Sequence, residues 1–297
     1  MSLGLRLHKE SKQATSTAVP NAARAGEPGF IRTADGVNLF YRDWGQGEPV
    51  VFVASWSLPS DMWNYQMLAL SEQGCHCVGF DPRGHGRSSD PGHGFDYDTL
   101  AGDLAAVLEV LDLRNATLIG HSMGCAVIVR YLTRHGGDRV ARIALLGTTT
   151  PLLARTADNP DGIDPTYFET FRSEQLMRDF PKWIEDTIPT FMPGTTRHMQ
   201  DWLRGLALQA SVKAMLDTNR TVTTEDFRDE LPKITIATLL IHGDQDVSSP
   251  IDITARRTAE LVPGAKLKVY EGAPHGLFVT HIDRLNRDLL DFALDRV

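Results

Sequence analysis

The sequence predicts an α/β fold, in which a mostly parallel sheet of about eight strands carries helices on both faces. Apolar, β-branched runs alternate along the chain with segments of helical periodicity, and this alternation is typical of parallel strands joined by helices. The connections are short and regular except for one long interval. With 297 residues, 42% of them hydrophobic, the chain can bury a large core in one sizeable domain.

The first predicted element is a β-hairpin. The runs GFIRT and VNLFYRDW flank the turn Asp35-Gly36, a residue pair that favours a tight reversal. The remaining strands are expected in the apolar runs VVFVAS (50–55), HCVGFD (76–81), ATLIG (116–120), RIALLG (142–147), ATLLIHGD (237–244) and KLKVYEG (266–272).

Helices are expected between these runs. Ser60 precedes DMWNYQMLALSEQG, which predicts a helix that is capped by Ser60 and ends at Gly74. Another helix follows from apolar side chains at helical spacing: Leu100, Leu104, Val107, Leu108 and Leu111. A third helix begins at Ser122 and ends near Gly136.

The long interval, residues 151–232, contains no strand-like run, and a structureless loop of this length is uncommon in a compact domain. We therefore expect a helical cap inserted into a core made of residues 30–150 and 233–297. The interval is rich in aromatic residues and methionine: Phe168, Phe171, Phe180, Trp183, Phe191, Met192, Met199 and Trp202. Such a stripe serves either packing or an apolar substrate pocket, and the sequence leaves both alternatives open.

Composition excludes several classes of partner. A net charge of −8 without a concentrated basic patch argues against nucleic acid and anionic lipid. No apolar stretch is long enough for a signal sequence or a membrane span, and residues 1–29 are expected to form a disordered tail. Cys75 and Cys77 are too close for an easy disulfide and lack the second pair that a zinc site needs, so with Cys125 they are interpreted as reduced thiols of a cytoplasmic protein without a metal.

The segment ATLIGHSMGCAVIVRYL indicates the chemistry. A strand leads into Gly120-His121-Ser122-Met123-Gly124, and a helix follows, which is the context of a nucleophile elbow. The turn is so tight that a Cβ two residues before or after the serine would clash, so glycine is needed at both positions. The alternative, a glycine-lined turn with a structural serine, does not explain why the helix begins at the serine. Ser122 is therefore the predicted nucleophile.

A serine hydroxyl needs a base, and ten histidines compete for this role. His275 follows the last predicted strand on a Pro/Gly loop, at the sheet edge where ligands bind in such folds. His85 and His93 lie in DPRGHGRSSDPGHG, which lacks the third glycine and following helix of a dinucleotide loop and is interpreted as structural. His135 is expected at a helix end and His242 at a strand end, as capping or packing residues.

The triad also needs an acid that orients the imidazole. The run LLIHGDQDV places Asp244 and Asp246 just beyond a buried strand, and the residues alone do not decide between them.

Together, GHSMG, DPRGHGRSS, IHGDQD and GAPHGL resemble the cofactor-free haloperoxidase and aryl esterase branch of the α/β-hydrolase family, whose members are perhydrolase-like. The resemblance runs from about Phe30 to the C-terminus and is weakest across the cap. It implies a serine hydrolase of small esters, sometimes lactones or amides, that needs no metal or organic cofactor. Many such proteins also convert carboxylic acids and hydrogen peroxide into peracids, which oxidise halides.

The resemblance also assigns roles to residues of this chain. It implies Ser122 as nucleophile, His275 as base and Asp246 as the residue that orients His275, while Asp244 matches the Asp of the His-Gly-Asp turn. It further implies that the backbone N–H groups of Trp56 and Met123 form the oxyanion hole. The substrate-binding residues are not indicated.

One stretch departs from the family pattern. The strand usually ends in His-Gly followed by the oxyanion residue, often Trp-Pro, whereas this chain has Ala54-Ser55-Trp56-Ser57. Glycine gives freedom of φ, so a left-handed Ser55 would cost about 1 kcal/mol. The N–H of Trp56 remains, and the hydroxyls of Ser55 and Ser57 offer further donors.

The expected function is hydrolysis of small aryl or alkyl esters, including lactones, through an acyl-enzyme. The first alternative is a cofactor-free perhydrolase, against which the absence of proline after Trp56 argues. The second is a small-molecule receptor or signalling protein that keeps the triad but turns over too slowly to act as an enzyme.

Overall fold

The computed structural model describes residues 29–296 and contains an eight-stranded sheet with the strand order β1-β2-β4-β3-β5-β6-β7-β8. The strands are β1 (Phe30–Arg32), β2 (Asn38–Trp44), β3 (Glu48–Val53), β4 (Cys75–Phe80), β5 (Ala116–His121), β6 (Val140–Leu146), β7 (Ala237–Gly243) and β8 (Lys266–Tyr270). Only the pairs β1–β2 and β2–β4 are antiparallel. The predicted α/β fold and its mostly parallel sheet are confirmed. Apart from Gly29, the predicted tail lies outside the described residues.

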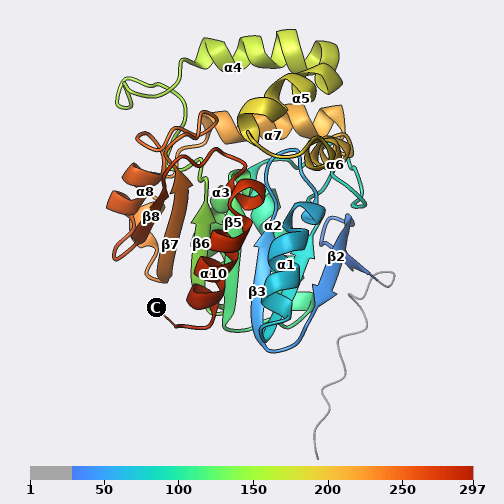
Figure 1. Ribbon diagram of the computed structural model, residues 1–297, viewed down its shortest axis with the longest axis vertical. Coiled ribbons are helices and arrows are strands. Elements are labelled where there is room, and N and C mark those ends of the chain that lie inside the picture. The colour runs from blue at the N-terminus through green and yellow to red at the C-terminus, as the bar shows by residue number, and fades with distance from the viewer. Residues whose placement is uncertain (1–28, 297) are drawn as a thin grey trace, which may run out of the picture.

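Helices cover both faces of the sheet, as expected. The helices of the core are α1 (Asn64–Ser71), α2 (Tyr97–Val110), α3 (Met123–His135), α8 (Ala255–Leu261), α9 (Leu277–Thr280) and α10 (Ile282–Ala293). α1 and α10 contact each other in front of the sheet in Figure 1, whereas α2 and α3 contact each other behind it. α3 ends at His135, next to the predicted end near Gly136, whereas α1 ends at Ser71, before the predicted end at Gly74. Of the residues at helical spacing, those from Leu100 to Leu108 lie in α2, and Leu111 follows its last residue.

Successive residues of a central strand supply the two halves of the core. In β3, Val50 and Phe52 pack with the side chains of α1 and α10, while Val51 and Val53 pack with those of α2 and α3. Side chains alternate between the faces of a strand, so a strand buried on both faces must be apolar throughout. The continuous β-branched runs in the sequence follow from this burial.

The predicted cap at Ser60 is wrong. Ser60 begins a 3₁₀ turn, Ser60–Trp63, that leads into α1, and its side chain makes no capping hydrogen bond there. Instead both its N–H and its hydroxyl donate to Asp81 Oδ1, at 2.8 and 2.5 Å. A buried carboxylate needs such donors, so this tertiary contact outweighs the local capping preference.

The long interval forms helices stacked above the carboxyl ends of the parallel strands (Figure 1). They are α4 (Pro165–Phe171), the π-helical turn Arg172–Leu176, α5 (Met177–Phe191), α6 (Arg197–Ala207) and α7 (Val212–Thr224), and a short 3₁₀ turn, Leu231–Lys233, leads back to β7. Apolar residues of α5 and α6 join the same buried cluster as α1 and α10. That residues 151–232 form a separate cap subdomain stays a prediction.

Within residues 29–296, no helix combines the length and the apolar character that crossing a membrane requires.

Candidate active site

The candidate residues come from four loops at one edge of the sheet. Parallel strands end at a common edge, so the loops after β3, β5, β7 and β8 carry Trp56, Ser122, Asp246 and His275 to the same place. The register supports this, since Val53 at the end of β3 lies opposite Gly120 near the end of β5.

Ser122 occupies a strained turn between β5 and α3. Its φ of 54° and ψ of −116° are rare for a residue with a side chain, and its N–H donates to Leu146 O at 2.9 Å. A Cβ added to Gly124 would lie 2.5 Å from Val53 O, and one added to Gly120 would lie 2.7 Å from Gly124 C. The steric argument for glycine at both flanks of the elbow is confirmed.

His275 and Asp246 form a buried pair. His275 Nδ1 lies 2.6 Å from Asp246 Oδ2. A carboxylate only accepts, so Nδ1 carries the proton and Nε2 is left as an acceptor. This is the tautomer that a general base facing a serine hydroxyl requires.

Asp246 has three further donors. Its Oδ1 accepts the backbone N–H groups of Ser248 and Ser249, at 2.9 and 2.8 Å, and its Oδ2 lies 3.1 Å from His242 Nε2. Burial by itself would raise the pKa of this carboxyl, but the charge of His275 and the hydrogen bonds from His242 and His275 hold the pKa well below its ordinary value. Asp246 is therefore an anion fixed in position.

Asp244 has a different environment. Its side chain is exposed and its Oδ1 accepts the backbone N–H of Gly272 at 2.7 Å. It ties the loop after β7 to the loop after β8 and does not pair with His275.

The oxyanion candidates are available as donors. Neither the N–H of Trp56 nor that of Met123 donates a hydrogen bond to another residue of the described part of the chain. Met123 is the first residue of α3, where backbone N–H groups have no partner inside the helix and carry partial positive charge. The indole Nε1 of Trp56 donates to Met215 O in α7 at 3.1 Å and so ties this loop to the helices above.

The expected strain at Ser55 is wrong. The non-glycine residue of this loop with positive φ is Ser57, at 69°, and Ser55 is not left-handed. Leu58 N donates to Ser55 O at 3.3 Å, so the four residues from Ser55 close a turn whose third position is left-handed. Proline cannot adopt the φ of Ser57, which accounts for its absence after Trp56.

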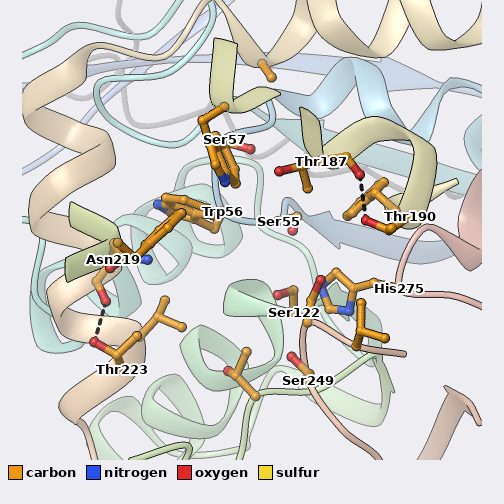
Figure 2. Close-up of a pocket in the computed structure, with 18 of the residues that line it drawn as sticks. Ser55, Trp56, Ser57, Ser122, Thr187, Thr190, Asn219, Thr223, Ser249 and His275 are labelled. Carbon is orange, nitrogen blue, oxygen red and sulfur yellow. Dashed lines mark hydrogen bonds between the residues drawn. The ribbon is translucent and has the colours of Figure 1, made fainter. Parts of the chain in front are cut away.

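Ser122 and His275 lie in the wall of a cavity of about 340 Å³ (Figure 2). Residues of α4, α5, α6 and α7 form much of the same wall. Its apolar lining includes Phe168, Phe171, Trp183 and Phe191. The other members of the predicted stripe do not line it. Phe180 and Met192 are buried in the core, and Met199 and Trp202 line a separate surface groove beside Tyr65. The stripe thus serves both packing and a pocket.

Three other histidines considered above do not line the cavity. Nδ1 of the buried His85 donates to Arg83 O at 2.9 Å, and Arg83 binds Asp103 through two hydrogen bonds, at 2.6 and 2.7 Å. His93 is exposed, and His135 stacks on Tyr131 in the last turn of α3.

Sequence reasoning missed His121 and the contact of His242 with Asp246. His121 Nε2 donates to His275 O at 2.9 Å, its ring centre lies 4.7 Å from that of His275, and burial followed by the charge of His275 lowers the pKa of His121 to about 3. His242 also bonds Ser249 O at 2.8 Å. The spacing His242–Asp246 gives a weak local hint, because four residues fit a tight turn, but only the packed structure aims both rings at these partners.

Among the described residues, no group of three or more His, Cys, Asp or Glu side chains is arranged to hold a metal ion.

The chain is similar to known hydrolases in sequence and in fold. Residues 48–282 match the family model described as alpha/beta hydrolase fold. The non-heme chloroperoxidase CPO-A1 of Kitasatospora aureofaciens is 39% identical over 88% of this chain and 97% of its own length. The bifunctional esterase/perhydrolase DCH of Acinetobacter calcoaceticus is 35% identical over 89% of this chain and 99% of its own. The solved esterase EaEST of Exiguobacterium antarcticum superposes with a TM-score of 0.86 at 31% identity, over 89% of this chain and 98% of that one.

Proposed function

Because the chain belongs to the α/β-hydrolase family, we propose that it is a serine hydrolase that cleaves small carboxylic esters through Ser122, His275 and Asp246. One observation carries the proposal. Ser122, strained at a strand-to-helix turn, lines the same cavity as His275, whose other ring nitrogen is fixed by Asp246.

The proposed reaction is acyl transfer in two steps. His275 Nε2 takes the proton of Ser122 as Oγ attacks the ester carbonyl, and the N–H groups of Trp56 and Met123 donate to the oxyanion. His275 then gives the proton to the leaving alcohol, and the acyl group stays on Ser122. Water, activated by His275 in the same way, releases the acid and restores the serine.

A second candidate, peracid formation, is supported by the relatives. The names of two of them include chloroperoxidase and perhydrolase. Both reactions share the acyl-enzyme, and hydrogen peroxide in place of water would release a peracid. This chain departs from the Trp-Pro pattern directly after Trp56. Ser57 is left-handed there, and proline cannot adopt that conformation.

The decisive experiment compares the parent protein with Ser122→Ala on p-nitrophenyl esters, on lactones, and on acetate with hydrogen peroxide and bromide. Loss of a triad nucleophile costs about a million-fold in kcat, so the variant should lose turnover in each assay while its circular dichroism is unchanged. Ser71→Ala serves as the control and should keep the parent rate, because Ser71 is a partly exposed serine on α1 that does not line the cavity.

The outcomes separate the candidates. A burst of p-nitrophenol followed by steady turnover supports the hydrolase, whereas a single stable adduct on Ser122 supports a receptor. Bromination that exceeds ester hydrolysis favours the perhydrolase. If Ser122→Ala keeps a tenth of the parent rate, the assignment of the nucleophile is overturned.

We further propose that residues 151–232 act as the cap of this site. The helices of the segment supply most of the apolar cavity wall.

We also propose that the protein works in the cytoplasm. Its three cysteines are buried free thiols, as is usual in a reducing compartment. Cell fractionation tests the location.

A further inference from the structure

One buried polar side chain in the cavity has no role in the proposed triad. Asn219 lies inside α7, is 6% exposed, and forms part of the cavity wall. Asparagine is unfavourable within a helix, because its amide competes for backbone hydrogen bonds. A buried side-chain amide needs hydrogen-bond partners for both its oxygen and its NH₂ group. The hydrogen bonds of Asn219 show which of these two groups has a partner within the protein.

The oxygen of this amide is held from behind. Arg172 donates from Nη1 to Asn219 Oδ1 at 2.8 Å and to Thr223 Oγ1 at 3.1 Å, and from Nη2 to Glu169 Oε1 at 2.6 Å. A guanidinium has donors only, so the atom it contacts must be the amide oxygen, and this fixes the orientation of Asn219. Its Nδ2 donates to no other residue within the described range 29–296.

The position of the amide is rigid. Arg172, at the start of the π-helical turn, is itself 3% exposed. α7 is fastened to the core by the bonds from Trp56 Nε1 to Met215 O, at 3.1 Å, and from Thr221 Oγ1 to Phe95 O, at 3.0 Å. An amide held in this way presents preorganised donors, which is how pockets recognise a polar group.

The amide lies away from the reacting serine. Figure 2 shows Asn219 and Thr223 on one side of the cavity and Ser122 and His275 on the other, with Trp56 between them. The cavity wall next to Asn219 includes Thr223, whose hydroxyl donates to Asn219 O and accepts from Arg172, and the apolar side chain of Val222. Arg172 is paired with Glu169. A charged carboxylate would have no free counter-ion here, so a neutral acceptor fits better.

We propose that Asn219 Nδ2 is a specificity-determining donor for esters that carry a neutral hydrogen-bond acceptor, such as a ketone or ether oxygen, at the end remote from the scissile bond. The inference rests on the proposed ester hydrolysis. A substrate without that oxygen leaves the buried donor unpaired, and this penalty gives the discrimination.

The test uses matched substrates. The p-nitrophenyl esters of 4-oxopentanoic, 5-oxohexanoic and 6-oxoheptanoic acid are compared with the pentanoate, hexanoate and heptanoate, and each kcat/KM is normalised to hydrolysis by hydroxide. A second series, acetates of keto-alcohols and of the matching alkanols, covers an acceptor on the alcohol side. The parent should prefer at least one keto ester by about tenfold, the worth of one hydrogen bond. The p-nitrophenyl monoester of succinic acid should show no such preference.

The variant Asn219→Asp keeps an oxygen for Arg172 and replaces the donor by an acceptor. It should abolish the keto-over-alkyl ratio. Asn64→Asp is the matched control, because Asn64 also accepts from an arginine, Arg42 Nη1 at 2.7 Å, but lies outside this cavity, and it should leave the ratio as in the parent.

The outcomes are distinguishable from failure of the proposed function. If the parent hydrolyses no ester, the proposed function fails. If it hydrolyses esters but both series give ratios near one, or if Asn219→Asp keeps the parent ratio, the role of Asn219 is overturned while the hydrolase stands. If Asn219→Asp does not fold, the keto-over-alkyl ratios of the parent still test the proposal, because ratios near one overturn it.

Discussion

Asp246 accepts hydrogen bonds from two histidine rings and two backbone amides, whereas Asp244 accepts one backbone N–H at the surface. This contrast separates two aspartates between which the residues alone do not decide, and it agrees with the choice of Asp246 that the family resemblance implies. A carboxylate that meets only donors cannot be replaced by an amide without setting donor against donor. The exposed turn residue can be replaced in this way, since an amide oxygen still accepts.

We therefore predict that Asp246→Asn lowers kcat for an aryl ester by about ten-thousandfold, because the amide favours the wrong tautomer of His275. Asp244→Asn is the control and should change kcat less than tenfold, with any effect seen in thermal stability. Steady-state kinetics with circular dichroism measure both. The reverse ranking would transfer the orienting role to Asp244.

The loop Ser55-Trp56-Ser57 gives a second prediction at this scale. Because Ser55 is not left-handed, Ser55→Gly relieves no strain and should not stabilise the protein; glycine costs about 0.5–1 kcal/mol through the flexibility of the unfolded chain. Two backbone donors complete the proposed oxyanion hole, so kcat should fall less than tenfold in both Ser55→Gly and Ser55→Ala. Urea unfolding and initial rates measure the two effects. A loss of a hundredfold or more in both variants, with KM unchanged, would make the Ser55 hydroxyl a third donor.

At the scale of elements, the start of α3 packs directly against the end of β3. A Cβ on Gly124 would lie 2.5 Å from Val53 O and 2.8 Å from Ala54 O, so the elbow and the oxyanion loop can approach only with glycine at this point. The contact is between backbones and cannot be relieved by a change of rotamer.

We predict that Gly124→Ala lowers the free energy of unfolding by about 1–3 kcal/mol and reduces kcat, since β3 must move and Trp56 with it. Gly102→Ala in α2 is the matched control. An added Cβ there meets no atom within 4 Å, so alanine should stabilise the helix by about 0.5–1 kcal/mol and leave kcat unchanged. Chemical unfolding of both variants tests this, and equal stabilities for the two would contradict the steric account.

At the scale of the whole molecule, His121 links the sheet to the loop of His275. Its ring is fully buried and contacts Trp63 and Phe278. Nε2 donates to His275 O, and Nδ1 has no partner among residues 29–296. Protonation would therefore place a second charged N–H in the core without an acceptor, so acidification should destabilise the fold.

The sign follows from the pKa values. Burial holds the pKa of His121 at about 3 in the folded protein, below the 6.5 of an exposed ring, so between these values the unfolded chain binds more protons. Stability is complete above pH 6.5 and should fall below it by at most about 1.4 kcal/mol per pH unit from this group. Burial also lowers the pKa of His85, so His85 changes the free energy of unfolding of the parent with pH in the same direction. Asp246 is protonated, and loses its contacts, only at lower pH.

Urea unfolding of the parent and His121→Gln between pH 4.5 and 7 checks this prediction. The glutamine amide can still donate to His275 O but does not titrate. The slope of the free energy of unfolding against pH should therefore decrease by the equivalent of up to one bound proton. His93→Gln, at an exposed position, should keep the parent slope. An unchanged slope in His121→Gln would show that His121 is not the group responsible.

The sequence by itself determined the sheet, the strained turn at Ser122 and the position of His275 at the carboxyl edge, because each depends on a short segment. Strands buried on both faces must be continuous apolar runs, the elbow must have glycine on both sides of Ser122, and a loop after the last strand must reach the carboxyl edge. These constraints act over a few residues and can be read without knowing the neighbours.

Only the tertiary structure decided which side chains meet across the cavity. Arg172 and Asn219 are 47 residues apart, and Trp56 and Met215 are 159 apart. The choice of Ser57 over Ser55 for the left-handed position, and the contact of Ser60 with Asp81 in place of a helix cap, likewise depend on what packs around them. Local preferences of about 1 kcal/mol yield to buried hydrogen bonds of comparable or greater strength, and those bonds exist only when distant segments have folded together.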